Sequence, residues 1–150
     1  METLRKKAIP WGRKELTAPW TLPDAAETAW EILLEIPAQQ QTGGLLLQVG
    51  NCFALELTLV SRTLHAYVKD TGEQTMQDCG TLQLVPGAPV RLQVFLDRCS
   101  AEIFADGKCL SVNVFDTAPL RPVSLIPQGG TLPLQLLQVW HLQHVMEPQT

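Results

Sequence analysis

Short runs in which apolar and polar residues alternate limit most strongly what this chain can fold into. The clearest run, residues 53–59, places Phe53, Leu55, Leu57 and Leu59 at every second position. Such alternation puts the apolar side chains on one face of a β-strand. Runs with the same period occur at residues 30–36, 64–68, 82–84, 90–97 and 132–143. Because no stretch has the 3.6-residue period of an amphipathic helix, the sequence predicts an all-β fold.

Glycine, proline and aspartate separate these runs and indicate tight turns between strands. Examples are Gly43-Gly44, Pro86-Gly87 and Asp106-Gly107, which contain the residue types that turns favour. About 10–12 short strands without long crossover connections favour an antiparallel sandwich or barrel. In the last run the apolar phase changes near Leu136, which predicts a β-bulge there.

The first 23 residues differ from the rest in their prolines. Pro10, Pro19 and Pro23 accompany Trp11 and Trp20 there, and proline disrupts helices because it lacks an N–H donor. We therefore expect residues 1–23 to form an extended lead-in and residues 24–150 to form the sandwich. The two tryptophans of the lead-in are expected to dock against a neighbouring domain or against the sandwich itself.

The segment from residue 90 to residue 114 allows a test of strand register. If Asp106-Gly107 forms a two-residue turn, Ile103 lies opposite Leu110, and a turn at Arg98-Cys99 places Ile103 opposite Val94. Both registers put the same apolar residues on one face, so the segment is predicted to be a three-stranded meander. The other face is more polar but still carries two phenylalanine rings. Its members are Gln93, Phe95, Glu102, Phe104, Cys109 and Ser111.

Composition excludes several classes of protein. The chain of 150 residues is 45% hydrophobic and 17% charged, which is enough for an ordinary core. Its longest apolar runs are a few residues, such as Leu45–Leu47, whereas a membrane-spanning helix needs about 20. The net charge is -4, and five of the 11 lysines and arginines lie in residues 1–14. The body therefore lacks the basic face that nucleic-acid binding needs. No secretory signal is visible at the N-terminus, which favours a cytoplasmic location.

The sequence predicts no catalytic residue, no metal site and no cofactor. His141 and His144 are three residues apart, which on a strand points them to opposite faces. No serine lies in a G-x-S-x-G turn and no glycine-rich loop leads from a strand into a helix. The cysteines are irregularly spaced and are predicted to be free thiols. They are Cys52, Cys79, Cys99 and Cys109.

Glu102 lies beside two aromatic residues in the predicted meander. Glycoside hydrolysis requires two carboxyl groups about 5–10 Å apart, which makes this residue a point of interest. The simpler interpretation is an outward strand residue that forms hydrogen bonds with a neighbour such as Gln93 or Arg91.

Aromatic residues are the other candidates for recognition. A tryptophan ring can stack on a sugar ring, but Trp30 and Trp140 lie within predicted strands, where packing is favoured. The candidate residues for carbohydrate binding or for an interface are Trp11, Trp20, Phe95, Glu102 and Phe104.

Residues 92–108, followed by residues 112–115, resemble the signature of the C-terminal β-sandwich of glycoside hydrolase family 32. This family comprises the β-fructosidases, among them invertase, sucrose-6-phosphate hydrolase, levanase and inulinase. Cys99 departs from the serine that is usual there, whereas Glu15-Leu16 and the strand around Trp140 resemble the start and end of the same domain. The matching signature residues are Asp97, Arg98, Ser100, Glu102, Phe104, Gly107 and Phe115.

The resemblance implies an antiparallel two-sheet β-sandwich of the jelly-roll or lectin-like type, appended to a five-bladed catalytic propeller. In the family the nucleophile, the transition-state stabiliser and the general acid lie in Asn-Asp-Pro, Arg-Asp-Pro and Glu-Cys-Pro motifs of the propeller. None of the three motifs occurs in this sequence. Because the retaining mechanism needs both nucleophile and acid, the chain is not expected to be an enzyme on its own.

Two functions from different classes remain open. The first is a non-catalytic domain that stabilises or docks onto a propeller in the same or a separate chain, or that mediates self-association. The second is a lectin-like module that binds fructans or other glycans. Solvent-exposed aromatic residues would serve either function.

Overall fold

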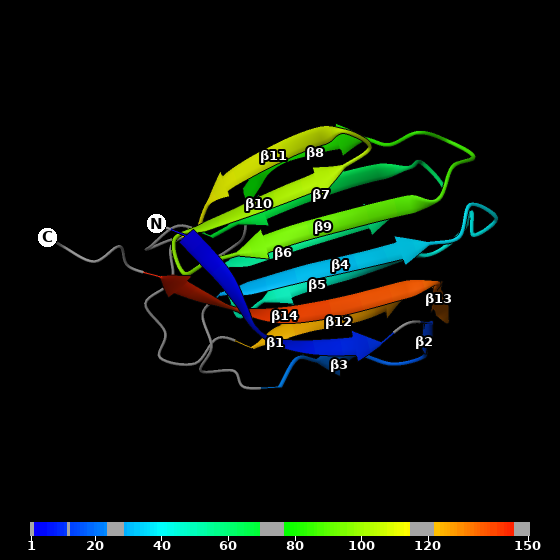
Figure 1. Ribbon diagram of the computed structural model, residues 1–150. Coiled ribbons are helices and arrows are strands. Elements are labelled where there is room, and N and C mark those ends of the chain that lie inside the picture. Colours follow the sequence, from blue (N-terminus) through cyan, green and yellow to red (C-terminus); the bar gives the residue numbers. More distant parts are fainter. Residues whose placement is uncertain (1, 12, 24–28, 70–76, 115–121, 146–150) are drawn as a thin grey trace, which may run out of the picture.

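The computed structural model describes residues 2–11, 13–23, 29–69, 77–114 and 122–145, and these residues form two six-stranded sheets packed face to face (Figure 1). They contain no helix, and every strand pairing is antiparallel. The predicted all-β sandwich is confirmed. The described residues form 14 strands, more than expected, because residues 2–23 contribute three. No helix among them is long and apolar enough to span a membrane.

The sheet nearer the viewer in Figure 1, called here the front sheet, has the strand order β1-β14-β4-β9-β10-β11. Its strands are β1 (Glu2–Trp11), β14 (Leu136–Val145), β4 (Trp30–Ile36), β9 (Val90–Leu96), β10 (Ser100–Ala105) and β11 (Lys108–Asn113).

The sheet behind it, the back sheet, has the order β3-β12-β5-β6-β7-β8. Its strands are β3 (Trp20–Thr21), β12 (Val123–Gln128), β5 (Gly44–Val49), β6 (Phe53–Thr58), β7 (Thr63–Val68) and β8 (Gln77–Gln83). A small third sheet pairs β2 (Lys14–Leu16) with β13 (Leu132–Leu134).

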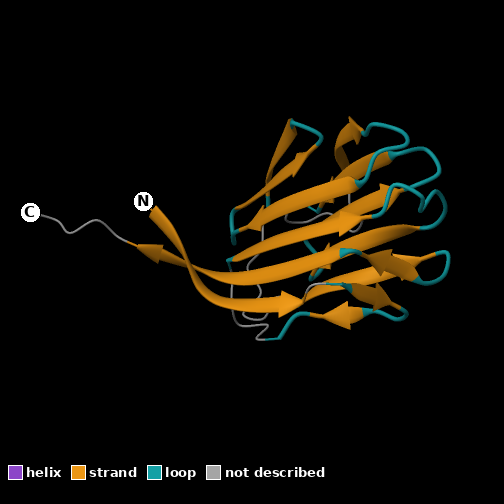
Figure 2. Cartoon of the chain, turned by 45° about the vertical axis from the view of Figure 1, so that its right-hand side comes forward, coloured by secondary structure: helices purple, strands orange, loops and turns teal. Residues whose placement is uncertain are grey.

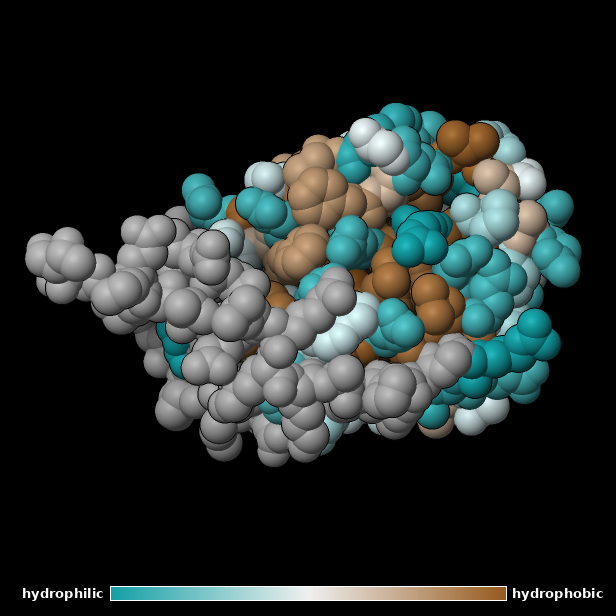
Figure 3. All heavy atoms as spheres, in the orientation of Figure 1, coloured by the Kyte–Doolittle hydropathy of each residue, from teal (hydrophilic) through white to brown (hydrophobic). Residues whose placement is uncertain are grey.

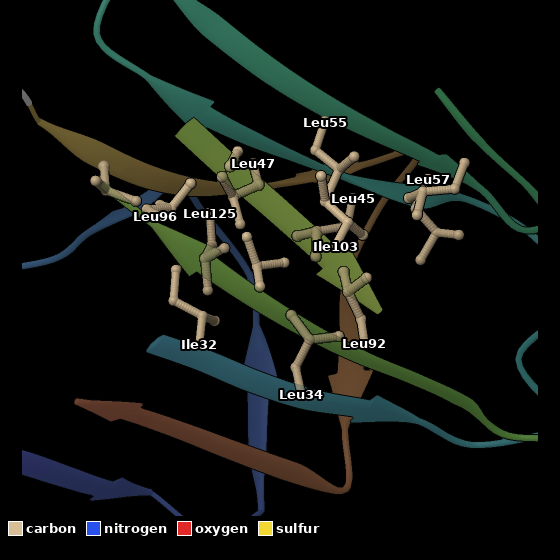
Figure 4. Packing of buried hydrophobic residues seen from close by; sticks show 14 of the residues in the cluster. Ile32, Leu34, Leu45, Leu47, Leu55, Leu57, Leu92, Leu96, Ile103 and Leu125 are labelled. Atoms are coloured by element: carbon tan, nitrogen blue, oxygen red, sulfur yellow. The ribbon is translucent and has the colours of Figure 1, made fainter. Parts of the chain in front are cut away.

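The core lies between the two large sheets and consists of aliphatic side chains at alternate strand positions (Figure 4). The front sheet contributes Ile32, Leu34, Leu92, Leu96 and Ile103, and the back sheet contributes Leu45, Leu47, Leu55, Leu57 and Leu125. None of the ten is more than 1% exposed. Full burial stabilises each such side chain by about 1.5–3 kcal/mol relative to exposure, so the alternation in the sequence decides which face of each strand is internal.

The meander formed by β9, β10 and β11 has the predicted register. Ile103 lies opposite Leu110 on one side and opposite Val94 on the other. Asp106 and Gly107 both have positive φ, 52° and 71°, as a type I′ turn requires. Turn type determined the register here, as expected.

The predicted bulge near Leu136 is wrong, because the chain changes sheets at that point. Residues 132–134 pair with β2, whereas β14 pairs with β1 on one side and β4 on the other. Gln135 lies between the two strands and donates its backbone N–H to the Glu35 carbonyl at 2.9 Å. The change of apolar phase therefore marks a break between two strands that face different neighbours.

Residues 2–11, 14–16 and 20–21 of the expected lead-in are strands of the sheets. β1, β2 and β3 pair with β14, β13 and β12, so the start of the chain lies beside its end. Leu16 and Leu22 are buried in the common core. The boundary predicted between residues 23 and 24 adjoins residues 24–28, which lie outside the described residues.

Candidate functional site

The outer face of the front sheet carries the main candidate residues. Because the inner face of each strand is in the core, the strand register identifies the side chains that point outward. One row across this face runs from Trp140 on β14 to Glu31 on β4, Phe95 on β9 and Glu102 on β10. Figure 3, which views this side, shows brown apolar and tan side chains among teal hydrophilic ones. The surface is thus mixed in polarity.

Two phenylalanine rings meet on this face. The centroids of Phe95 and Phe104 are 5.9 Å apart and the rings are perpendicular, an edge-to-face arrangement that aromatic pairs favour. Phe104 is 37% exposed. The prediction that these two rings share a face with Glu102 is confirmed.

Carboxylates lie on the same face as the aromatic pair. Glu31 is 3% exposed and accepts a hydrogen bond from Gln93 Nε2 at 3.0 Å, and Glu35 lies 3.6 Å from the Arg91 guanidinium. Gln93 and Arg91, expected as partners of Glu102, therefore contact residues of β4 instead. The hairpin analysis missed this because β4 is distant in sequence but adjacent to β9 in the sheet. Glu102 is exposed, and its side chain has no partner among the described residues.

A pocket of about 270 Å³ opens at one end of the row, next to the turn between β9 and β10. Phe95 forms an apolar wall, and Asp97, Ser100 and Glu102 supply polar groups. Ala29, Leu96 and Leu142 complete the lining. This combination of an aromatic ring with hydrogen-bond acceptors suits a small hydroxylated ligand.

The signature residues Asp97 and Arg98 shape the turn beside the pocket. The Asp97 side chain accepts a hydrogen bond from the Arg98 backbone N–H, and the Asp97 N–H donates to the Ser100 carbonyl at 2.8 Å. These contacts give the pair a role in turn geometry. Phe115, the last signature residue, lies outside the described residues.

Of the two lead-in tryptophans, Trp20 is not part of this site, and the structure describes only the backbone of Trp11. The backbone of Trp11 lies in β1 opposite Leu137. Trp20 is half-buried at the edge of the back sheet, where it packs against the core with the Lys14 ammonium 5.8 Å from its ring. The structure therefore brings together Phe95, Glu102 and Phe104, and it places Trp20 elsewhere.

Within the described residues, no group of three or more His, Cys, Asp or Glu side chains is suited to hold a metal ion. All four cysteines are free thiols, and only Cys52 is buried.

Sequence reasoning missed a second set of polar residues, on the outer face of the back sheet. Glu56, His65 and Tyr67 occupy polar positions of the alternating runs. The only signal in the sequence was that all three occupy polar positions of alternating runs and so point outward. Which residues lie beside them depends on the register of three strands.

A comparison with protein families matches almost the whole chain to one of them. The family model described as the C-terminal domain of glycosyl hydrolases family 32 matches residues 2–141. A search of curated proteins finds no match.

Solved structures with the same fold include two enzymes and a galectin. An exo-inulinase from Aspergillus awamori is 14% identical with a TM-score of 0.59, over 97% of this chain and 29% of the enzyme. A fructofuranosidase from Schwanniomyces occidentalis is 8% identical with a TM-score of 0.68, over 95% of this chain and 34% of the enzyme. Galectin LEC-6 from Caenorhabditis elegans is 11% identical with a TM-score of 0.52, over 87% of this chain and 96% of the galectin.

At these identities the structural similarity shows the fold alone. The chain spans about a third of the length of either enzyme. The family model covers the meander with its signature, the buried start at Leu16 and most of the closing strand β14. The chain therefore belongs to the C-terminal β-sandwich domains of glycosyl hydrolase family 32.

Proposed function

We propose that this domain docks onto a catalytic domain of family 32 through the outer face of its front sheet and takes no part in bond cleavage itself. The observation that carries the proposal is the edge-to-face pair of the exposed Phe104 and the half-buried Phe95 on the outer face of the front sheet. Aromatic residues that remain exposed on a rigid sheet are enriched at protein interfaces.

The charges around the pair indicate what the partner surface must contain. Asp97 and Glu102 line the pocket beside Phe95, and Glu102 is opposite Phe95 in the sheet. A complementary surface has an apolar recess for the Phe104 ring and arginine or lysine side chains opposite Glu102. The relatives support a partner of this kind, because the chain aligns with only 29% of the inulinase and 34% of the fructofuranosidase.

Calorimetry with a family 32 propeller expressed as a separate chain tests this proposal. The expected result is a complex that Phe104→Ser weakens by at least about tenfold, the range of an interface hot spot. Val60→Ser is the matched control, because Val60 is 76% exposed and lies in the turn between β6 and β7. Absence of a complex, or equal weakening by both variants, would contradict the proposal.

An activity assay of the purified chain, without a catalytic domain, gives a second test. The purified chain is expected to release no fructose from sucrose above a mock preparation, because hydrolysis with retention needs a nucleophile and an acid held about 5 Å apart. Fructose release by the purified chain would overturn the non-catalytic role.

Carbohydrate binding is a second candidate function, and the pocket beside the aromatic pair favours it. Phe95 offers a ring face, and Asp97, Ser100 and Glu102 offer acceptors for sugar hydroxyls. Calorimetry with levan, inulin and sucrose is expected to show heat of binding that Phe95→Ala abolishes. No heat with any of the three would count against a glycan-binding module.

A further inference from the structure

A cluster of polar and aromatic side chains lies on the outer face of the back sheet, on the opposite side of the sandwich from the Phe95–Phe104 pair. It spans β6, β7 and β8, which Figure 1 shows behind the front sheet. The strand register places Glu56 opposite His65, His65 opposite Thr81, and Tyr67 opposite Asp78. We call these five residues the back-sheet cluster.

The imidazole of His65 is held in place from one side. Its Nδ1 lies 2.9 Å from the Thr81 hydroxyl and 3.6 Å from the Asp78 carboxylate. The ring lies at 29° to that of Tyr67, with centroids 6.2 Å apart. Nε2, the other ring nitrogen, has no partner among the described residues. The contacts to Nδ1 orient this imidazole and leave Nε2 available.

Two further groups of the back-sheet cluster lack partners. Neither the Glu56 carboxylate nor the Tyr67 hydroxyl forms a hydrogen bond or ion pair with any described residue. On the same face, Thr21 and Ser124 satisfy each other at 2.9 Å, as do Ser61 and Thr63 at 2.6 Å. The absence of partners is therefore a property of the cluster and not of the whole face.

The electrostatic character of the cluster is negative. Burial raises the pKa of Tyr67, and the carboxylates of Glu56 and Asp78 raise it further. The hydroxyl stays protonated at neutral pH and can donate a hydrogen bond. Two carboxylates disfavour an anionic ligand, and no described group is suited to a metal ion.

We propose that the back-sheet cluster binds a saccharide unit. The sugar's C–H face would lie against the Tyr67 ring, as aromatic recognition of pyranose and furanose rings requires, while its hydroxyls donate to Glu56. Tyr67 Oη and His65 Nε2 supply the complementary donor and acceptor. Hydrogen bonds to an ionised acceptor are the strongest of these contacts. This site is separate from the front-sheet pocket and independent of docking to a catalytic domain.

A nuclear magnetic resonance titration of the isotope-labelled full chain with sucrose, a short-chain inulin and galactose tests the proposal. At least one of the three is expected to shift amide resonances of β6, β7 and β8. Glu56→Gln and Tyr67→Ala are each expected to weaken that binding by about tenfold or more. Glu15→Gln is the matched control, because it removes an exposed strand carboxylate of β2 that belongs neither to the back-sheet cluster nor to the front-sheet pocket. Unchanged spectra outside the mutated strand confirm that each variant is folded.

Three results would overturn the proposal. The first is no shift in these strands with any of the three sugars at high millimolar concentration. The second is binding that Glu102→Gln weakens and Glu56→Gln leaves unchanged, which assigns the sugar to the front-sheet pocket. The third is tighter binding of ethanolamine than of any sugar at the back-sheet cluster, which assigns the site to an ammonium ligand. Loss of propeller docking in a Phe104→Ser variant tests the docking proposal alone, because Phe104 lies on the front sheet and the back-sheet cluster lies on the other sheet.

Discussion

Neighbouring residues on one strand have opposite environments in this domain. Ile103 is fully buried, and it lies opposite Val94 and Leu110, whereas the next residue, Phe104, is 37% exposed and contacts Phe95. Both are large apolar residues, so residue type alone does not separate core from interface. The pleat of the strand does, because successive side chains point to opposite faces.

This difference predicts unequal costs of substitution. Ile103→Ala is expected to lower the free energy of unfolding by about 2–5 kcal/mol, because it leaves a cavity in the core. Phe104→Ala is expected to cost about 1 kcal/mol, the worth of its edge-to-face contact. Urea denaturation measures both. Equal costs would mean that Phe104 is also a core residue and would remove the basis of the docking surface.

Tyr67 is the only tyrosine in the chain, so its ionisation can be followed directly by ultraviolet absorbance. Burial and then the Glu56 and Asp78 carboxylates raise its pKa above the ordinary value of 10.0. Above that pH the unfolded chain has lost a proton that the folded chain retains, so stability falls as pH rises through this range. Tyr67→Phe is expected to flatten the fall. An unchanged slope, or a Tyr67 pKa at or below 10.0, would contradict the assignment.

The Cys79 thiol on β8 also has a raised pKa. Burial raises its pKa, with a further contribution from the Asp78 carboxylate that a backbone hydrogen bond partly offsets. Because the thiolate is the reactive form, iodoacetamide is expected to modify Cys79 more slowly in the folded domain than in urea. Asp78→Asn should accelerate the reaction in the folded domain. A rate that Asp78→Asn leaves unchanged would show that access to the thiol, and not its charge state, limits the reaction.

At the scale of the element, the turn between β10 and β11 links two parts of the sheet system. Asp106 adopts a positive φ in the turn, and its Oδ2 accepts a hydrogen bond from the Val85 N–H at 2.6 Å. The Lys108 ammonium group donates a hydrogen bond to the Gln83 carbonyl oxygen at 2.6 Å. The hairpin of the front sheet is thereby attached to the segment that leaves β8 of the back sheet.

Substitutions of Asp106 separate turn geometry from this link. Asp106→Asn keeps a side-chain acceptor and tolerates positive φ, so the variant is expected to retain most of the stability. Asp106→Ala removes the acceptor and strains the backbone, and it is expected to cost about 1–3 kcal/mol. Thermal and urea unfolding measure the difference. If the two variants were equally stable, the contact with Val85 would have no energetic role.

At the scale of the whole molecule, the first strand pairs with the last. Figure 2 shows β1 and β14 running side by side and extending beyond the body of the sandwich. β1 covers one edge of β14, while β4 covers the other. The two ends of the chain therefore complete the front sheet together.

Removal of residues 1–11 is expected to expose an edge of β14 with unpaired backbone groups. Such edges associate with strands of other molecules. In sedimentation experiments, the apparent molecular mass of the truncated chain should increase with protein concentration. The full chain should not associate through this edge of β14, because β1 covers it. A truncated chain that sediments as the full chain does would mean that β1 has no protective role.

Local features of the sequence were sufficient for much of the fold. The alternation from Phe53 predicted β6, and the Asp106-Gly107 turn predicted both registers of the meander, because each depends on residues close in sequence. The shared face of Phe95, Glu102 and Phe104 followed from these registers. The signature around Asp97 and Arg98 indicated the family.

Contacts between distant parts of the chain were beyond the reach of these arguments. The neighbour of Gln93 is Glu31, 62 residues away, and β4 reaches β9 only because the sheet order places it there. The break at Gln135 separates two strands whose partners are also remote in sequence.

The amino-acid sequence by itself therefore determined strand character, inward and outward faces within each hairpin, and membership of the family, since all three depend on local periodicity and short motifs. Only the tertiary structure decided the order of strands in the sheets, the pairing of the chain ends and the assembly of the pocket and the back-sheet cluster. The physical reason is that antiparallel pairing has a period of two residues, which specifies the face of each side chain but leaves open which remote strand lies beside it.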